Sequence, residues 1–276
     1  MADGRSILIT GCSSGIGDFT AGALKERGYR VFATARKDRD VTELRSQGFE
    51  ALQLDLANSA SIESAVEAVL EKTGGKLYGL FNNGAYGIVG AVEDLSRDAI
   101  RDLFEVNLFG THELTRLVIP VMRRQGYGRI IQNSSILGFI TLKYRGAYNA
   151  SKHALEGLTD TLRLELRGSN IHVSLIEPGP IESAFRQNAY LAYNKYIDKT
   201  NSYFRDLYEA QETRLQMEGP AVPFTLGPDA VCRKVVHALE SKQPKARYYV
   251  TFPTYMFAWL KRFLPGSLMD MILSRI

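Results

Sequence analysis

The sequence predicts a doubly wound α/β fold, in which helices cover both faces of a parallel sheet. Short apolar runs typical of buried strands alternate with helical patterns along most of the chain. The strand runs are residues 7–10, 30–35, 51–55, 78–82, 129–134, 172–177 and 248–252. Such alternation implies right-handed crossovers between parallel strands. We therefore expect one seven-stranded parallel sheet within a single domain of residues 1–276.

The helical patterns between these runs include residues 19–27, 61–72, 97–125 and 146–167. Gly28 ends the first of them, as glycine does at many helix ends. Pro120 lies inside the third, where a missing N–H group and a crowded ring disturb a helix. The sequence therefore predicts a kink or a division of that helix at Pro120.

Composition excludes several classes of protein. The hydrophobic fraction of 45% and the charged fraction of 23% are ordinary for a globular protein. A net charge of +4 without a basic run gives no sign of nucleic-acid binding, and the four histidines have no metal-ligand spacing. Only Cys12 and Cys232 are present, which suits a reducing compartment, and neither a secretory signal nor an integral membrane segment is found. We expect a cytoplasmic protein without metal.

A glycine-rich turn follows the first strand run. It reads Gly11-Cys12-Ser13-Ser14-Gly15-Ile16-Gly17 and leads into the first helical pattern. Strand, glycine turn and helix in this order are typical of a dinucleotide site, where backbone N–H groups and the helix N-terminus face a pyrophosphate. A plain turn rich in glycine and serine is the alternative explanation.

Chemically versatile residues follow or close the strand runs, and we expect them to share one site. Ligands of such sheets bind at the carboxyl ends of the strands. The residues concerned are the Gly11 turn, Arg36, Asp55, Asn82, Ser135 and Pro178.

Tyr148 and Lys152 form the most informative pair. They lie four residues apart in a helical pattern, so they share a face, and Ser135 lies thirteen residues upstream of the tyrosine. An ammonium group beside a phenol lowers the pKa of the phenol from about 10, which suits proton transfer to or from a carbonyl or alcohol oxygen. The motif alone is weak, because a surface tyrosine beside a solvated lysine gives the same pattern.

Together these features resemble the classical short-chain dehydrogenase/reductase family over residues 5–185. Further landmarks appear in the order that family shows: Asp55-Leu56, Asn82-Asn83-Gly84-Ala85, Asn107, Ser134-Ser135 and Pro178-Gly179-Pro180-Ile181-Glu182-Ser183. Residues 174–181 and 247–251 are similar to the steroid and retinol dehydrogenase-like branch, especially to its bacterial NADP-dependent aldehyde reductases. Two departures stand out: Gly84-Ala85 reverses the usual order, and Ser183 replaces a common threonine.

The resemblance implies a Rossmann domain and assigns roles. Tyr148 would be the general acid, Ser135 would stabilise the substrate oxygen, Lys152 would lower the tyrosine pKa and bind the nicotinamide ribose, and Asn107 would hold a water for proton resupply. The implied cofactor-binding residues are Gly11, Ser13, Ser14, Gly15, Ile16, Gly17, Arg36, Asp55, Leu56, Asn82, Gly84, Tyr148, Lys152, Pro178, Gly179, Ile181 and Ser183.

The end of the second strand predicts NADP(H) as the cofactor. Arg36 and Lys37 follow it, and no carboxylate appears before Asp38 to bind the ribose hydroxyls of NAD. A guanidinium suits a phosphate, although a solvated Arg36 is the plainer explanation.

We therefore expect an NADPH-dependent reductase of aldehydes or ketones with apolar bodies. The alternatives are an NADP-dependent secondary-alcohol dehydrogenase of steroid or retinol type and a non-catalytic NADP(H)-binding sensor.

Two segments fall outside the alternating pattern. Residues 184–226, rich in tyrosine, are expected to form a substrate loop, with an ordinary helical excursion as the alternative. The apolar tail, residues 253–276, could cover the substrate entrance, form a subunit contact or lie on a membrane surface. We expect a homodimer with the tail buried against protein.

Overall fold

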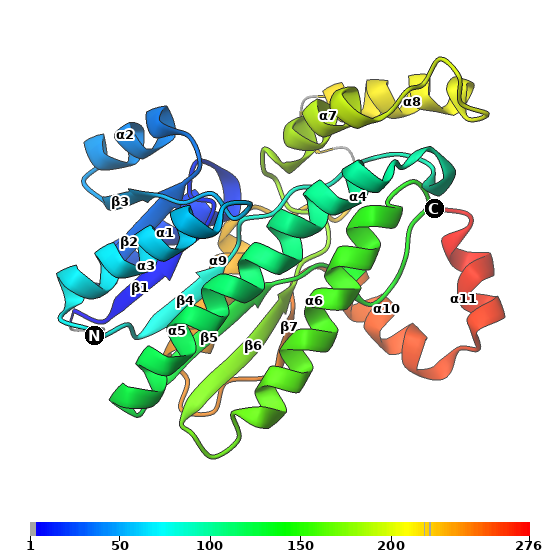
Figure 1. Ribbon diagram of the computed structural model, residues 1–276. Coiled ribbons are helices and arrows are strands. Elements are labelled where there is room, and N and C mark those ends of the chain that lie inside the picture. The colour runs from blue at the N-terminus through cyan, green and yellow to red at the C-terminus, as the bar shows by residue number, and fades with distance from the viewer. Residues whose placement is uncertain (1–3, 218, 221) are drawn as a thin grey trace.

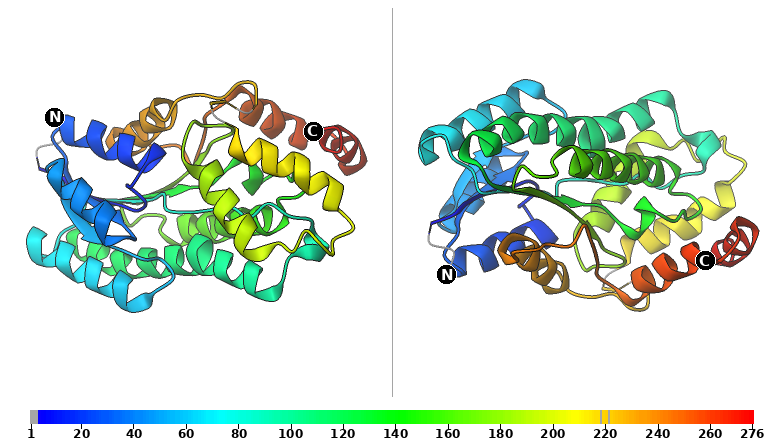
Figure 2. Two further views of the ribbon diagram at one scale, coloured as in Figure 1. Left: turned by 90° about the horizontal axis from the view of Figure 1, so that it is seen from above. Right: turned by 90° about the horizontal axis from the view of Figure 1, so that it is seen from below.

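All seven strands of the computed structural model join one parallel sheet. The structure describes residues 4–217, 219–220 and 222–276. The strand order is β3-β2-β1-β4-β5-β6-β7, with helices on both faces, which confirms the predicted fold class (Figures 1 and 2). The strands are β1 (Ser6–Ile9), β2 (Arg30–Ala35), β3 (Glu50–Gln53), β4 (Gly79–Asn82), β5 (Gly128–Asn133), β6 (Ile171–Glu177) and β7 (Arg247–Tyr249).

The side chains of β1 alternate between two apolar cores, and each core packs one layer of helices against the sheet. Ile7 and Ile9 pack in a core on one face with α1 and α9, while Leu8 packs in the core of the opposite face with α3 and α5. Successive side chains of a strand point to opposite faces, so a strand buried on both sides is apolar throughout. The helices are α1 (Gly15–Glu26), α2 (Asp38–Ser46), α3 (Ser59–Thr73), α4 (Arg97–Phe104), α5 (Thr111–Gln125), α6 (Gly146–Glu165), α7 (Phe185–Tyr196), α8 (Arg205–Gln216), α9 (Asp229–Glu240), α10 (Phe252–Phe263) and α11 (Gly266–Leu273).

Two predicted boundaries are wrong. The helical pattern 97–125 is not divided at Pro120, which lies inside α5. A π-helical segment, η2 (Glu105–Gly110), separates α4 from α5 instead, and such wide turns often occur at functional sites. The last strand ends at Tyr249 rather than at residue 252, because Phe252 begins α10 and Pro253 suits a first helical turn.

Residues 184–226 form a packed helical layer rather than an open loop. Helices α7 and α8 lie together beyond the strand ends, at the top of Figure 1. Tyr193 and Tyr208 are fully buried there beside Ile88 and Leu103, and the Tyr208 hydroxyl accepts a hydrogen bond from the Ala91 N–H at 2.9 Å. This layer is therefore packed on the rest of the domain through a shared apolar core.

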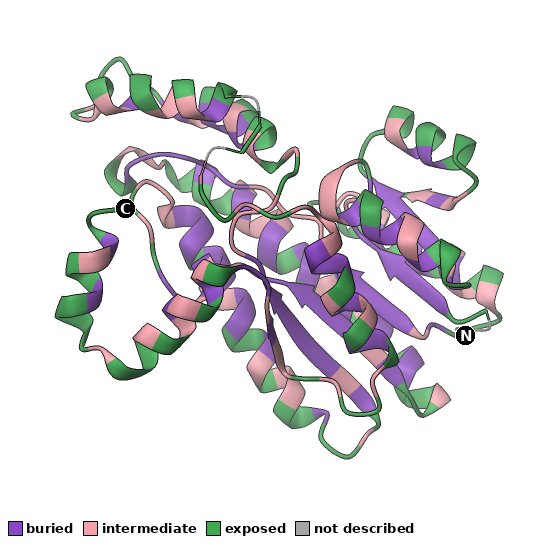
Figure 3. Ribbon diagram, turned by 180° about the vertical axis from the view of Figure 1, so that it is seen from behind, coloured by how far each residue is buried: buried purple, intermediate pink, exposed green. Residues whose placement is uncertain are grey.

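The tail forms α10 and α11, which lie beyond the β7 edge of the sheet. Phe257, Met269 and Leu273 are buried, whereas Trp259 and Phe263 are 62% and 61% exposed. Figure 3 shows exposed positions alternating with more buried ones along the tail helices. The inner face of the tail is therefore buried against the rest of the chain, and its burial in a homodimer stays a prediction. Among the described residues, no helix combines the length and apolarity that crossing a bilayer requires.

Candidate active site at the carboxyl ends of the strands

The glycine turn is shaped for close approach of an anion to the backbone. Gly11 and Gly15 have φ of 71° and 62°, a region that favours glycine. A Cβ atom at Gly17 would lie 2.2 Å from the carbonyl oxygen of Gly11, so only glycine fits there. The side chain of Ser14 makes no capping bond at the start of α1, which leaves the N-terminal N–H groups free to face a phosphate.

Asn83 and Thr10, which the sequence analysis did not select, hold this turn in place. Asn83 Nδ2 donates to the carbonyl oxygens of Thr10 and Gly11 at 3.0 and 3.2 Å. Thr10 Oγ1 accepts from the backbone N–H groups of Asn83 and Gly84 at 2.9 and 2.8 Å. The pair of asparagines after β4 was the available signal, but sequence alone did not say which one faces the turn.

The side chain of Asn82 points away from the glycine turn. Its side chain is buried and donates to Thr115 Oγ1 on α5 at 2.8 Å. Strand alternation sends neighbouring side chains to opposite sides, so Asn82 and Asn83 diverge. The side chain of Asn82 is therefore not among the groups that face the cofactor turn.

The reversed Gly84-Ala85 order has a packing reason. A Cβ atom at Gly84 would lie 3.1 Å from Leu56 Cδ1 and 3.3 Å from Thr10 Oγ1. Leu56 itself is buried, and the Asp55 carboxylate accepts a bond from the Ala57 N–H at 3.0 Å, which fixes the turn after β3. A methyl group at position 84 would crowd this corner.

Arg36 follows β2 at the same edge of the sheet and is exposed. The Cys12 N–H donates to the Thr34 carbonyl oxygen at 2.8 Å, so the glycine turn begins beside the end of β2. Within the described ranges, no carboxylate lies within ion-pair distance of Arg36, while Arg39 pairs with Asp40 at 3.2 Å. The Arg36 guanidinium is available to an anion.

The turn after β6 closes the other side of the site. The Pro178 carbonyl oxygen accepts from the Ile136 N–H at 2.7 Å, which joins this turn to the segment that carries Ser135. A Cβ atom at Gly15 would lie 2.8 Å from Ser183 Cβ, so the two turns meet. Gly179 is equally constrained, since its Cβ would lie 2.1 Å from Thr251 Oγ1. Ile181 forms an isolated bridge with Leu226.

Tyr148 and Lys152 lie on one face of α6, as predicted, and both are buried. Lys152 Nζ donates to the Asn133 carbonyl oxygen at 2.7 Å and lies 5.7 Å from the centre of the Tyr148 ring. Ser135 begins a short 3₁₀ turn, where its Oγ accepts from the Leu137 N–H at 3.1 Å. The structure thus brings Tyr148, Lys152 and Ser135, three of the four predicted catalytic residues, close together.

Burial, rather than the charge of Lys152, determines the direction in which the pKa of Tyr148 is shifted. Desolvation raises the pKa of Tyr148 to about 12, and a hydrogen bond with Ser135 offsets part of this effect. The predicted fall of this pKa is therefore wrong for this arrangement, because removing a phenolate from water outweighs its polar contacts. Burial also lowers the pKa of Lys152 to about 8, against an opposing effect of Glu156. Tyr148 is consequently a protonated phenol at neutral pH.

Asn107 lies in the π-helical segment, and its side chain has structural partners. Its Oδ1 accepts from the Tyr86 N–H at 3.1 Å, and its Nδ2 donates to the Tyr86 carbonyl oxygen at 2.8 Å and to Ser151 Oγ at 3.2 Å. The side chain joins the segment after β4 to the helix that carries Lys152. Its role in holding a water stays a prediction.

Phe185, at the start of α7, is a site residue that sequence reasoning missed. Its ring contacts Tyr148 edge-to-face, with ring centres 5.2 Å apart. A Cβ atom at Gly87 would lie 2.9 Å from Phe185 Cζ and 3.6 Å from Tyr148 Cδ2, so Gly87 provides the space for this contact. Its position directly after the Pro178 turn was the only sequence signal.

The buried side of the C-terminal tail packs in the same apolar cluster as Tyr148. Phe257, Met269 and Leu273 belong to one apolar cluster with Leu137 and Tyr148. In the part of the chain that the structure describes, no group of His, Cys, Asp and Glu side chains could hold a metal ion. The side of Tyr148 that faces the tail is therefore apolar.

We predict that Gly17→Ala weakens dinucleotide binding by at least tenfold while the fold is retained, because the added methyl must push the Gly11 carbonyl away. Fluorescence titration with NADH and NADPH measures the affinity, and circular dichroism checks the fold. Gly22→Ala in the same helix is the control, since its Cβ has no neighbour within 4 Å. Equal affinity in the two variants would contradict the role of the turn.

Comparisons with known proteins agree with this geometry. The family model described as short chain dehydrogenase matches residues 5–194. The chain is 44% identical over 270 residues to a protein of Escherichia coli strain K12 called Uncharacterized oxidoreductase YbbO, covering 98% of this chain and 94% of that protein.

Two solved structures resemble it over nearly their whole length. A short-chain dehydrogenase/reductase from Burkholderia phymatum in complex with NAD has a TM-score of 0.78 and 26% identity, covering 94% of this chain and 92% of that one. An actinorhodin polyketide ketoreductase variant with NADPH has a TM-score of 0.72 and 29% identity, covering 91% and 97%. The chain belongs to the short-chain dehydrogenase family and is an NAD(P)-dependent oxidoreductase.

Proposed function

We propose that the protein is an NADPH-dependent reductase of aldehydes or ketones with apolar bodies. The observation that carries this proposal is the buried, protonated Tyr148 beside Lys152 and Ser135, at the edge of the sheet that holds the glycine turn. The Tyr148 phenol carries its proton at neutral pH and can donate it to a carbonyl oxygen, which carbonyl reduction requires.

Each of these residues has a separate role in the proposed reaction. The bound dinucleotide supplies a hydride, which forms the new C–H bond at the carbonyl carbon. The Tyr148 hydroxyl donates its proton to the carbonyl oxygen, and the product is the alcohol. Ser135 Oγ donates a hydrogen bond to the same oxygen while negative charge develops on it. The Lys152 ammonium, close to the Tyr148 ring, stabilises the phenolate that the proton transfer leaves.

An apolar substrate body is supported by the residues that surround Tyr148. Leu137, Ile140 and Phe257 lie in its cluster, and Phe185 contacts its ring. We assign residues 184–226 as the substrate loop and the inner face of the tail as a wall of the substrate pocket. Water is excluded from both sides, which strengthens each polar contact with the carbonyl oxygen.

Selectivity for NADP(H) is assigned to Arg36. This side chain is exposed at the end of β2, and no carboxylate occupies the position that would bind the ribose hydroxyls of NAD. The planar guanidinium can bind a phosphate through two parallel hydrogen bonds.

The alternatives differ from this proposal in chemistry. A secondary-alcohol dehydrogenase would run the same steps in reverse, with Tyr148 accepting the proton of the alcohol. A sensor would not need an ammonium in the interior at Lys152, where burial is costly. The closer likeness to bacterial aldehyde reductases, a homodimer and a cytoplasmic location stay predictions.

We predict that Tyr148→Phe lowers kcat for aldehyde reduction by about 10²-fold or more, because phenylalanine keeps the ring and removes the donated proton. NADPH affinity should change less than threefold, since the turn is untouched. Absorbance of NADPH with an aldehyde panel measures the rate. Tyr203→Phe, at an exposed position, is the control. Wild-type turnover in the Tyr148 variant would refute the mechanism.

We predict that Arg36→Ala raises KM for NADPH by roughly 10- to 100-fold and leaves KM for NADH nearly unchanged, because one charge-assisted contact with a phosphate is lost. Steady-state kinetics with each cofactor at a fixed aldehyde concentration measures the effect. Arg39→Ala, which removes a nearby cation already paired with Asp40, serves as the control. Parallel changes for both cofactors would disprove phosphate recognition.

We predict that Met269→Ala raises KM for a long-chain aldehyde several-fold more than KM for a short one, because Met269 lies in the Tyr148 cluster. Met271→Ala changes an exposed residue of the same helix and should affect neither substrate. Thermal melting of both variants identifies any loss of folding. If the two methionine variants behave alike, the tail is not a wall of the pocket.

A further inference from the structure

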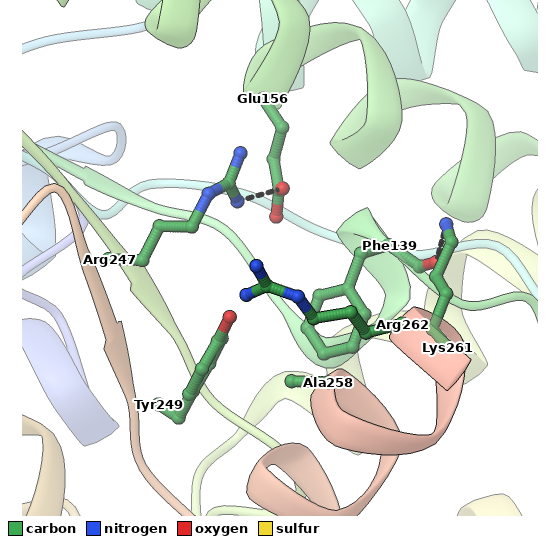
Figure 4. Close-up of a pocket in the computed structure, with 7 residues that line it drawn as sticks. All are labelled: Phe139, Glu156, Arg247, Tyr249, Ala258, Lys261 and Arg262. Carbon is green, nitrogen blue, oxygen red and sulfur yellow. Dashed lines mark hydrogen bonds and ion pairs between the residues drawn. The ribbon is translucent and has the colours of Figure 1, made fainter.

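A cluster of buried charges lies behind the catalytic helix. The guanidinium of Arg247 on β7 bonds the carboxylates of Glu156 and Asp160, both on α6, and of Glu177 on β6. Glu156 and Glu177 are buried, and Arg247 and Glu156 border a hollow of about 230 Å³ (Figure 4). Removing charged groups from water costs free energy, so a partly buried arginine that contacts three carboxylates is an unusual arrangement.

The cluster sets one arginine against three carboxyl groups. Burial and the neighbouring Glu156 raise the pKa of Glu177 to about 8, so Glu177 takes up a proton more readily than an ordinary carboxyl group. Arg247 also pairs with Glu156 and with the partly exposed Asp160.

Glu156 also lies next to the segments that carry the proposed catalytic residues. It follows Lys152 by four residues on α6, so the two share a face of the helix. Its Oε1 accepts from Ser134 Oγ at 2.8 Å, and a Cβ atom at Gly138 would lie 2.2 Å from the same oxygen. The carboxylate therefore supports the segment that carries Ser135.

We propose that Glu156 is a positioning residue, which favours the positive charge on Lys152 and fixes the Ser135 segment, while Arg247 holds the Glu156 side chain in place. This inference rests on the proposed function, because it concerns the lysine that assists Tyr148. The groups around the Lys152 ammonium are Tyr148 and Glu156 on α6 and the Asn133 carbonyl oxygen on β5.

The burial of Lys152 determines whether kcat/KM rises or falls with pH. The pKa of Lys152 is lowered to about 8, so the ammonium form is present below that pH and is lost as pH rises through it. The kcat/KM for reduction should therefore fall above pH about 8. Without the Glu156 charge, the pKa of Lys152 falls further, and the loss of activity moves to lower pH.

The test compares Glu156→Gln with Glu165→Gln, an exposed carboxylate on the same helix. Glu156→Gln should lower kcat/KM about fivefold at pH 8 and less than twofold at pH 6, as expected when an opposite charge is removed. Glu165→Gln should match the wild type at both pH values. Glu156→Asp keeps the charge but shortens the side chain by one methylene group, so the alkaline limb should move to lower pH by less than in Glu156→Gln. An unmoved limb in Glu156→Gln, with activity lowered equally at all pH values, overturns the inference.

A second measurement separates this inference from the proposed function. Carbon NMR of protein labelled at lysine Cε follows the Lys152 titration without substrate, with its signal assigned by its absence from Lys152→Met. A lower pKa in folded Glu156→Gln, checked by circular dichroism, supports the role of Glu156 even if no carbonyl is reduced. An unchanged pKa overturns it. If Glu156→Gln does not fold, the titration of Lys152 in Glu156→Asp tests the inference instead. A Lys152 pKa below the wild-type value supports the inference, and an identical pKa overturns it.

Discussion

One chain of hydrogen bonds joins the catalytic lysine to the cofactor turn. Lys152 Nζ donates to the Asn133 carbonyl oxygen, Asn133 Nδ2 donates to Asn83 Oδ1 at 2.9 Å, and Asn83 Nδ2 donates to the carbonyl oxygens of Thr10 and Gly11. These bonds lie in the interior, where unpaired donors are costly, so each side chain has one favoured position. The distance between the proton donor and the pyrophosphate turn depends on them.

The same edge of the sheet gathers the other functional segments through backbone contacts. The Pro178 turn binds the Ile136 N–H, and Ser183 packs on Gly15. Three segments far apart in sequence thereby form one continuous rim around Tyr148. Glycines at the closest approaches leave little freedom for movement, which preorganises the site before a cofactor binds.

Burial at this site acts in opposite directions on its two titratable groups. It raises the pKa of Tyr148 to about 12 and lowers that of Lys152 to about 8, since each group loses its charged form. In the proposed reaction, the phenol donates its proton and the lysine must remain charged to stabilise the phenolate. We propose that Glu156, which is buried one helical turn from Lys152, serves this purpose.

The sequence by itself determined the fold class, the glycine turn and the Tyr148–Lys152 pair, because period and spacing are local properties that survive folding. It located the site at the strand ends, since parallel topology brings those ends together. Only the tertiary structure decided that Asn83 rather than Asn82 faces the turn, and that Phe185 touches Tyr148. Those choices depend on side-chain direction and on contacts between distant segments, which spacing does not encode. The pKa of Tyr148 was likewise decided by burial, a property of the packed molecule rather than of its neighbours in sequence.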